Sequence, residues 1–286
     1  QNMRVLNQKD FLYNSVTVEV QTVIRTNLVL ALENETNRSV RHRICDVVGE
    51  LGSYLLLDEK ANKWPELQPK LFQLLSTGNP AQRESGLRVL RDLIPTIGIN
   101  LIKSHKDSFM HVLRVAMEEE TSVGNRCQAV LIVCSIAENL PARFWKPFQQ
   151  SFGQPMLTVI KTICDSGNED EVRDCLEALI AVIEEESLFF KPFLGDLIGL
   201  CFQIANGKDD LEDGTRQLAF ELIISLAEKK SKLCVKIPNF VQLAIRTSMS
   251  FMLEMEDSDV AQWAARFSDG DGDEATNYDV GEENID

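Results

Sequence analysis

Cysteine and histidine are the residue types in this chain that could bind a metal or act as a nucleophile. The 286-residue sequence has seven cysteines and three histidines. The cysteines occur singly, with no Cys-x-x-Cys pair and no histidine close by, so their spacing predicts no zinc site. Their odd number and irregular spacing favour a reducing compartment, where free cysteines serve as small apolar core residues. They are Cys45, Cys127, Cys134, Cys164, Cys175, Cys201 and Cys234.

The three histidines are poorly placed to share a ligand. His105 and His111 are six residues apart, which puts them on different faces of a helix, and His42 is distant in the sequence. We therefore expect surface or helix-packing roles for all three.

A run of acids near the C-terminus imitates the beginning of a calcium-binding EF-hand loop. Asp269, Asp271 and Asp273 alternate with glycine, as the first five positions of such a loop would require. The sixth position is then Glu274 instead of glycine, and the twelfth is Val280 instead of glutamate. Calcium binding is therefore not predicted.

Motifs for catalysis or phosphate binding are also missing from the sequence. It contains no Gly-x-Gly-x-x-Gly, no Walker loop and no His-Glu-x-x-His, so we predict no enzymatic activity and no cofactor. The formal charge of −15 and the isoelectric point near 4.7 argue against nucleic acid as a ligand and favour a basic partner. No apolar run approaches the roughly 18 residues of a membrane span, so a membrane is not an expected partner either.

Four acids are the first candidates for contact with such a basic partner. Asp46, Asp92, Glu177 and Glu221 lie off the apolar stripe of their predicted helices, four to nine residues beyond the basic residue near the start of each, which is Arg41, Arg83, Arg173 or Arg216. If these helices line a concave face, the acids form an anionic surface whose field is focused by the curvature. The alternative is an ordinary solvated helix face.

These helices belong to a repeat. Hydrophobic spacing predicts helices nearly everywhere, in pairs, and each second helix has an anchor position just after its start. Successive anchors are 42, 41, 49, 43 and 45 residues apart, a mean of about 44 that lies within the range of HEAT and armadillo repeats. The anchors are Arg41, Arg83, Gly124, Arg173, Arg216 and, more weakly, Ala261.

The apolar stripe of each second helix shows why the pairs must stack. In the fifth repeat Leu218, Leu222 and Leu226 are four residues apart, so they form one face that a lone helix pair cannot cover. We predict an all-α fold, a right-handed α-solenoid of about six HEAT repeats over residues 1–267. The repeats are placed at residues 16–57, 64–97, 100–139, 141–187, 190–230 and 234–267.

Short polar turns separate the two helices of a repeat. Gly78 and Gly167 are placed to end a helix in the left-handed conformation, while Asn79 and Asp170 are placed to cap the helix that follows. The anchor arginines are expected to make hydrogen bonds from one repeat to the next, not to bind a ligand.

Trp64 and Pro65 mark the start of a first helix. Pro65 suits the first helical position, where its missing N–H is no loss. Trp64 is expected to pack the incoming chain onto the repeat core, as a structural device and not as a ligand-binding residue.

The acidic charge is concentrated at the C-terminus. Residues 254–286 contain 12 acids and a single basic residue, Arg266, so they carry −11 of the total charge. The last stretch is also poor in apolar residues, so we expect an acidic, disordered tail over residues 268–286. It adds four residues to the candidates for contact with basic partners: Asp269, Asp271, Asp273 and Glu274.

Three segments make the chain resemble the importin-beta (karyopherin-beta) family, and within it the importin beta-3, or importin four/five, subfamily. They are Trp64–Leu67 (WPEL), Asp209–Ala219 (DDLEDGTRQLA) and Ala275–Tyr278 (ATNY). The resemblance extends along essentially the whole chain and places it in the N-terminal half of such a protein, as about a third of a solenoid of about twenty HEAT repeats. The chain departs from its own anchor pattern at Gly124.

What the resemblance implies is nuclear import. Such a receptor shuttles between cytoplasm and nucleus, binds basic cargo through its nuclear localisation signal, and releases it when Ran-GTP binds. Nucleoporins are further expected partners. The repeats that dominate Ran contact in the family are missing here, so Ran is expected to bind mainly outside this chain.

Two other functions are compatible with a row of HEAT repeats. One is a non-catalytic scaffold subunit of an enzyme complex, which periodicity does not exclude. The other is a tubulin-binding array, which needs basic or aromatic residues in its turns. The turns here are mostly acidic, as at Glu118–Glu120 and Lys208–Asp210, which disfavours tubulin.

Overall fold

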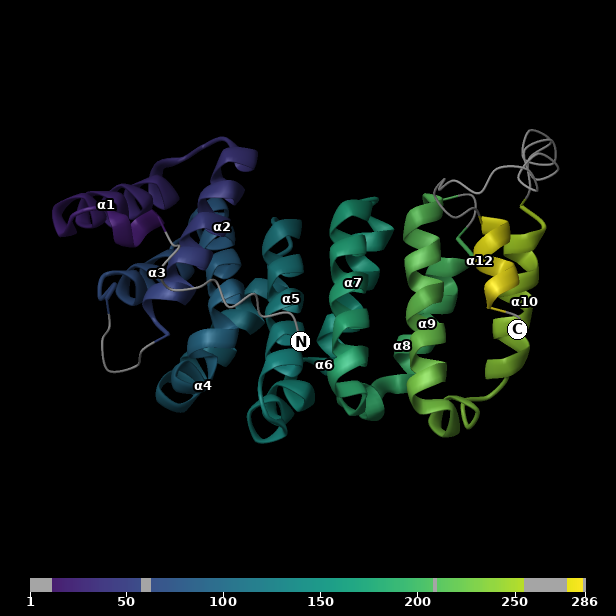
Figure 1. Cartoon of the computed structure of the whole chain (residues 1–286). Helices are drawn as coiled ribbons and strands as arrows, with labels where there is room; N and C mark the ends of the chain where they lie inside the picture. Colours follow the sequence, from purple (N-terminus) through teal and green to yellow (C-terminus); the bar gives the residue numbers. More distant parts are fainter. Residues whose placement is uncertain (1–11, 58–62, 208–209, 255–276, 285–286) are drawn as a thin grey trace. The chain divides into compact units, whose positions relative to one another are not determined.

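The computed structural model describes residues 12–57, 63–207, 210–254 and 277–284, and this part of the chain is helical with no β-strand. It divides into two compact units, residues 1–132 and 133–286 (Figure 1). The all-α, paired-helix fold predicted from the sequence is confirmed. The α-helices are α1 (Val18–Asn34), α2 (Arg38–Leu55), α3 (Leu67–Leu75), α4 (Pro80–Glu118), α5 (Val123–Asn139), α6 (Ala142–Asp165), α7 (Glu169–Glu186), α8 (Leu194–Ala205), α9 (Asp213–Cys234), α10 (Phe240–Met252) and α12 (Asn277–Glu283). Two 3₁₀ segments, η1 (Leu12–Ser15) and η2 (Ser187–Phe193), complete the set.

The second helices begin where the repeat predicted them. The anchor pattern places their starts at residues 39, 81, 122, 171 and 214, and α2, α4, α5, α7 and α9 begin within two residues of these positions. The sixth anchor and the acidic residues 268–276 lie outside the described residues. The limits of the repeats stay predictions. The disorder predicted over residues 268–286 is wrong for residues 277–283, which form α12, a helix that packs against α10.

In the first unit α2 packs against α4, and α3 packs against the same helix. Trp64 is 1% exposed and lies in the core with Leu67 and Leu71, as predicted for a residue that fixes the start of a first helix. Pro65, however, is not at the first helical position. The helix α3 begins two residues later, because a turn closed by Leu67 N–H donating to the Trp64 carbonyl (3.2 Å) precedes it.

Helix α4 joins two predicted helices. The sequence separates the second helix of one repeat from the first helix of the next near residues 97–100, but α4 runs without a loop for 39 residues. The break is a kink at His105, whose backbone is non-helical (φ −138°, ψ 29°). The His105 ring meets Phe72 edge to face at 5.2 Å, so this histidine has the packing role expected of it.

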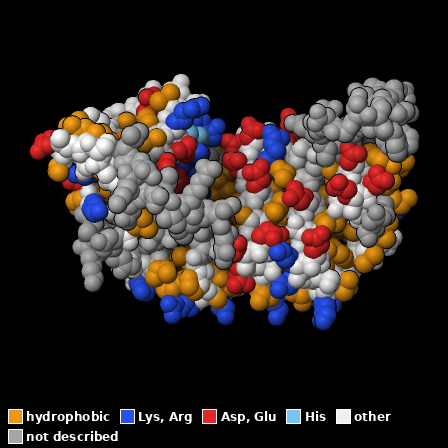
Figure 2. Space-filling view, viewed as in Figure 1, with side chains coloured by type: hydrophobic (Ala, Val, Ile, Leu, Met, Phe, Trp, Pro, Cys, Tyr) orange, Lys and Arg blue, Asp and Glu red, His pale blue; other side chains and the backbone are white. Residues whose placement is uncertain are grey.

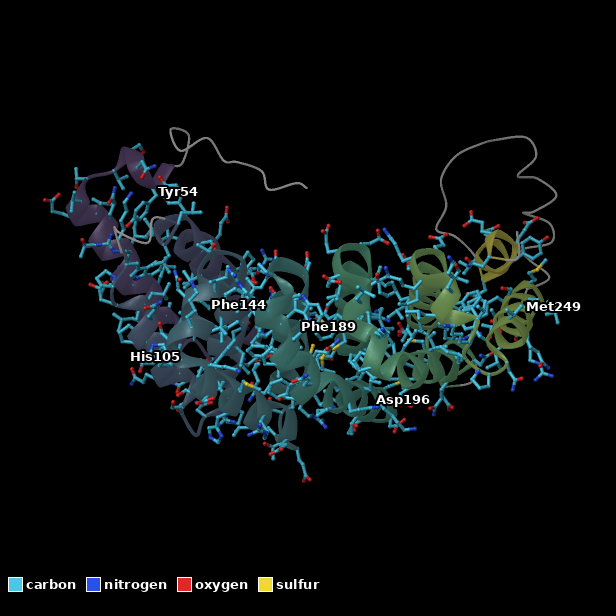
Figure 3. All side chains as sticks on the ribbon, turned by 90° about the horizontal axis from the view of Figure 1, so that it is seen from below. Tyr54, His105, Phe144, Phe189, Asp196 and Met249 are labelled. Carbon is cyan, nitrogen blue, oxygen red and sulfur yellow. The ribbon has the colours of Figure 1, made fainter. Side chains whose placement is uncertain are left out.

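In the second unit the first helices α6, α8 and α10 alternate with the second helices α7 and α9, as Figure 1 shows. Helix α9 packs against both α7 and α8, and α12 packs against α10. Phe189 is fully buried among these helices, whereas Met249 on α10 is 54% exposed on the outer side (Figure 3).

One stretch of the second unit is, by length and hydropathy alone, a candidate membrane span. The sequence analysis considered only uninterrupted apolar runs and did not predict it. Residues 169–205 reach a mean hydropathy of 1.5 in their most apolar window, but 61% of that window is buried inside the protein. The stretch is also interrupted: α7 ends at Glu186, η2 follows, and α8 begins at Leu194. Its apolar character belongs to the repeat core.

The turns confirm half of the predicted caps. Asn79 accepts a hydrogen bond from the Ala81 N–H at 3.0 Å, and Gly167 has the left-handed backbone (φ +73°). Gly78 does not have a positive φ, so its predicted role was wrong. Asp170 does not cap α7 either, because α7 begins one residue before it and its carboxylate accepts from Arg173 instead.

Candidate functional site

The first anchor arginine, Arg41 on α2, binds Glu84 on α4 at 2.9 Å, with both side chains more than 90% buried. Glu84 also accepts from Arg38 at 3.2 Å and lies 3.2 Å from His42 Nε2. Burial would raise the pKa of Glu84, but the Arg41 hydrogen bond and the Arg38 and His42 charges together hold it below its usual range. The pKa of His42 is lowered, mainly by burial.

Gly124 is the one strong anchor that is not arginine. The Glu84 carboxylate explains why glycine occupies this position. A Cβ atom added at Gly124 would lie 2.3 Å from Glu84 Oε1. Only glycine at this position of α5 leaves room for the buried ion pair between α2 and α4. The departure from the anchor pattern is therefore a packing requirement.

The second anchor, Arg83, joins the turn within the second repeat to the turn within the third. It donates to the Thr77 carbonyl at 2.6 Å and pairs with Glu119 at the end of α4. Asn125 on α5 donates to the same Glu119 carboxylate at 2.7 Å. The arginine therefore connects one repeat with the next, as predicted.

The anchors of the second unit make the same kind of connection. Arg173 on α7 donates to Glu212 at 2.8 Å and to the Thr215 hydroxyl at 3.1 Å. In return, Glu169 at the start of α7 accepts from the Glu212 N–H at 3.0 Å and from the Thr215 hydroxyl at 2.6 Å. The N-terminal ends of α7 and α9 are held together by this exchange.

Arg216 on α9 makes the most buried of these connections. It donates to both oxygens of Glu254, just past α10, at 2.7 and 2.8 Å, and to the Ala205 carbonyl at 3.1 Å. Its guanidinium also lies 4.9 Å from the centre of the Phe251 ring. All four anchor arginines therefore have the repeat-to-repeat role predicted for them.

The candidate acids of the first unit are already paired with cations. Asp46 on α2 accepts from Arg88 of the neighbouring α4 at 2.8 Å. Asp92 pairs with Arg91 at 2.8 Å and lies against Gly49, where a Cβ would be 2.7 Å from it. Burial raises the pKa of Asp92 in spite of these arginines. This helix face therefore carries charges of both signs, and contact of Asp46 and Asp92 with a basic partner stays a prediction.

The candidate acids of the second unit lie differently. Glu177 on α7 and Glu221 on α9 are both exposed, on two helices that pack side by side. Neither makes an ion pair within the described residues, and Figure 2 shows acidic side chains spread over this face. Asp174, one turn before Glu177 and also exposed, belongs to the same face and was missed. Its spacing of three residues from Glu177 was the available signal.

Ion pairs limit this acidic face at both ends. Arg173 binds Glu212 near the N-terminal ends of the helices, and Lys229 binds Glu184 at 2.7 Å near their C-terminal ends. Between them Asp174, Glu177 and Glu221 form what we call the α7–α9 acidic face. The other candidates, Asp269, Asp271, Asp273 and Glu274, lie outside the described residues.

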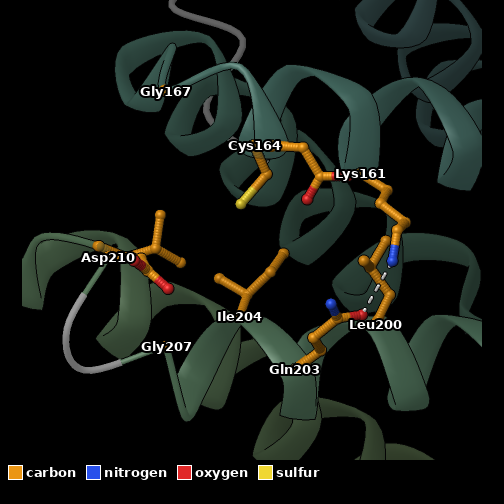
Figure 4. Close-up of a pocket in the computed structure, with 10 residues that line it drawn as sticks. Lys161, Cys164, Gly167, Leu200, Gln203, Ile204, Gly207 and Asp210 are labelled. Carbon is orange, nitrogen blue, oxygen red and sulfur yellow. Dashed lines mark hydrogen bonds between the residues drawn. The ribbon is translucent and has the colours of Figure 1, made fainter.

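A cavity of about 460 Å³ lies elsewhere in the second unit, between the C-terminal ends of α6 and α8 (Figure 4). Leu200, Ile204 and Cys164 line it, and Lys161 Nζ donates to Gln203 Oε1 at its rim over 3.3 Å. The pKa of the Cys164 thiol is raised by burial and by nearby carboxylates, which disfavours the reactive thiolate. The predicted acids are not part of this cavity.

A family model described as "IPO5-like, TPR repeats" matches residues 36–200, and one described as "Importin repeat" matches residues 208–286. The chain belongs to the importin-beta family. Importin subunit beta-3 of Saccharomyces cerevisiae is 26% identical to this importin chain. The match covers 94% of this chain. The helix period of 41 to 49 residues is that of HEAT repeats, longer than the 34 residues of a TPR.

Solved structures confirm the fold. The karyopherin Kap121p bound to the SUMO protease Ulp1p matches 97% of this importin chain, with 24% identity and a TM-score of 0.75. Kap121p bound to Nup53p matches the same share with a TM-score of 0.74. The chain spans about a quarter of the length of these relatives, 24% of the yeast subunit and 26% of Kap121p, which is less than the third expected.

Proposed function

We propose that this chain is a segment of a nuclear transport receptor that binds basic protein segments on the α7–α9 acidic face. The observation that carries the proposal is the pair Glu177 and Glu221, exposed on adjacent helices with no ion pair in the described residues. Carboxylates placed this way attract lysine and arginine side chains, and the fields of neighbouring carboxylates add, which strengthens the attraction.

The relatives support a protein partner. Kap121p is known bound to Ulp1p and to Nup53p. A Kap121p variant has three acidic residues replaced by lysine at positions 43 and 42 residues apart, a spacing of one acid per repeat. Glu177 and Glu221, 44 residues apart, have the same relationship.

The rest of the proposal follows from the family. The receptor shuttles between cytoplasm and nucleus, Ran-GTP releases the cargo by binding mainly to repeats outside this chain, and nucleoporins are further partners. In this role the chain catalyses no reaction. Asp269, Asp271, Asp273 and Glu274 are proposed as a second anionic element that contacts basic partners.

Binding of a fluorescent lysine-rich peptide, followed by anisotropy, tests the acidic face. The double variant Glu177→Lys, Glu221→Lys is expected to bind about tenfold more weakly, with a shallower salt dependence. The control is Asp196→Lys, a single acid-to-lysine reversal on the first helix α8, which is expected to stay within about twofold of the wild type. Equal weakening by the control, or none by the double variant, would rule out the face.

A second experiment separates a receptor from a scaffold. The chain extended to the full length of its relatives is used to capture proteins from extract, with and without Ran locked in its GTP form. Loss of basic proteins on addition of Ran supports transport. Stoichiometric capture of one enzyme, unaffected by Ran, supports the scaffold instead.

A further inference from the structure

The second unit has a basic side that the proposed function does not use. Three connecting segments, called the three turns below, lead from a second helix into the next first helix. They are residues 140–147, which include the start of α6, residues 187–193, which form η2, and residues 235–240. Each carries an exposed lysine, and these lysines are spaced 45 residues apart: Lys146, Lys191 and Lys236. Arg143 is exposed in the first turn, and the three ranges contain no acidic residue. We call these four residues the basic edge.

Buried aromatic rings hold the turns of the basic edge in place. Trp145, next to Lys146, meets Phe189 of the second turn edge to face at 5.6 Å. Gln149 donates to the Phe189 carbonyl at 2.5 Å, so the start of α6 and η2 are joined through the backbone as well. Lys146 and Lys191 therefore project from fixed positions, which reduces the entropy lost when a partner binds.

Apolar side chains are exposed beside these cations. Leu188 is 48% exposed in the second turn, and Val235 is 60% exposed in the third. In the first turn Phe144 is partly exposed, and the Arg143 guanidinium lies 4.9 Å from the centre of its ring. A surface that alternates cations with apolar groups suits a partner that alternates acids with apolar groups.

The basic edge is electrostatically separate from the acidic ends of the same helices. The acids Glu169, Asp170 and Asp213 lie at the opposite ends of α7 and α9, which are 18 and 22 residues long. A rise of 1.5 Å per residue makes that separation roughly 27–33 Å, three Debye lengths or more at physiological salt. Figure 2 shows the result, with blue side chains gathered along the lower margin of this unit and red ones above.

Some carboxylates do lie near the basic edge, at the C-terminal ends of the preceding helices. They are Glu138 on α5, Glu184, Glu185 and Glu186 on α7, and Glu228 on α9. Glu184 is neutralised by Lys229 at 2.7 Å, and the pKa of Glu138 is raised by burial and by the charge of Glu185. The four cations of the edge make no ion pair with any of them in the described part of the unit. Their charge is therefore available to a partner.

We propose that the basic edge of Arg143, Lys146, Lys191 and Lys236 binds an acidic protein segment whose carboxylates alternate with apolar residues. Neighbouring packed helices are about 8–10 Å apart, and a peptide in the polyproline II conformation repeats every three residues over about 9 Å, so an acid at every third position lies on one face and matches successive turns. The partner is a short peptide and not nucleic acid, because the chain's charge of −15 repels a long polyanion. This site is independent of the α7–α9 acidic face.

A labelled peptide tests the basic edge directly. The probe is about 12 residues long, an extended length of roughly 40 Å, with glutamate at every third position and leucine between. At about 50 mM salt, where screening is weak, we expect saturable binding to the 286-residue chain. The triple variant Lys146→Glu, Lys191→Glu, Lys236→Glu should weaken binding at least about tenfold. Lys161→Glu, an exposed lysine at the opposite end of α6, should stay within about twofold.

Three outcomes would overturn the proposal: no saturable binding, equal weakening by Lys161→Glu, or displacement of the peptide by single-stranded RNA of the same charge at a lower concentration. Replacing leucine by serine in the peptide should weaken binding, because Leu188 and Val235 then lose their contacts. The triple variant should still bind the lysine-rich peptide as the wild type does, which shows that it is folded. A negative result at the basic edge therefore does not contradict the proposal for the acidic face. A negative result at the acidic face does not contradict the basic edge either.

Discussion

Arg216 and Glu254 form a bidentate ion pair, 38 residues apart in sequence, with side chains only 2% and 6% exposed. Asn277 at the start of α12 donates to the same carboxylate at 3.0 Å, and Gln217 donates to the Asn277 side chain at 2.8 Å. One buried carboxylate therefore joins α9, the end of α10 and the start of α12. Glu254 and Asn277, which lie 23 residues apart in the sequence, are therefore joined directly by this network.

Breaking this pair should destabilise the second unit strongly. Arg216→Ala leaves the Glu254 carboxylate buried without its cation, and removing one partner of a buried pair costs about 3–5 kcal/mol. Urea unfolding followed by circular dichroism measures the loss. Arg173→Ala is the control, because its partner Glu212 is 71% exposed, and it should cost less than about 1 kcal/mol. Equal costs for the two arginines would contradict the argument.

Much of this arrangement could be predicted from the sequence. The anchor spacing located five second helices within two residues, because an apolar stripe and a helix start are local features. The role of the arginines followed from their recurrence at the position where one repeat meets the next. The kink at His105 could not be predicted, because whether two helices join through a loop or a kink depends on packing against Phe72.

The charge of the helix faces was harder to predict. Asp46 and Glu177 occupy similar positions in their repeats, but Arg88 of the next helix neutralises Asp46, and no arginine among the described residues does this for Glu177. That difference depends on which residues of two helices, about 40 residues apart in sequence, face each other. The repeat period does not define this register to within one residue. The sequence does contain a pattern that could have predicted the basic edge. An aromatic residue followed by Lys-Pro-Phe occurs twice, at residues 145–148 and 190–193.

Gly124→Ala should destabilise the first unit. The new Cβ would lie 2.3 Å from Glu84 Oε1 and would displace a carboxylate that binds Arg41, so overpacking and a disturbed ion pair together should cost about 2–4 kcal/mol. Gly214→Ala is a matched control near the start of α9, where a Cβ meets nothing within 4 Å. It should be neutral or stabilising by up to about 1 kcal/mol. Thermal unfolding of both variants measures the difference.

Lowering the pH should reduce the folding stability of the first unit, first through protonation of His42 and, at lower pH, through protonation of Glu84. The pKa of His42 in the folded protein is below its usual 6.5, so the unfolded chain binds the proton first and stability falls as the pH drops below about 6.5. The lowered pKa of Glu84 adds a further loss below its usual 4.5, while the raised pKa of Asp92 opposes it. His42→Asn should flatten the decline between pH 7.5 and 5.5, measured by urea unfolding at both. An unchanged slope would exclude His42 as its cause.

Helix α10 offers a test of which of its faces belongs to the core. Phe251 is fully buried, with its ring 5.5 Å from that of Phe220 and close beneath Arg216, whereas Met249, two residues earlier, is 54% exposed. Phe251→Ala should therefore cost about 3–5 kcal/mol, since it removes a packed ring and the cation–π contact of a buried arginine. Met249→Ala should cost less than about 1 kcal/mol, because its side chain is already largely in water. Urea midpoints of the two variants give the comparison, and a larger loss for Met249→Ala would mean that the apolar stripe of Val241, Ile245 and Met249 is covered in solution.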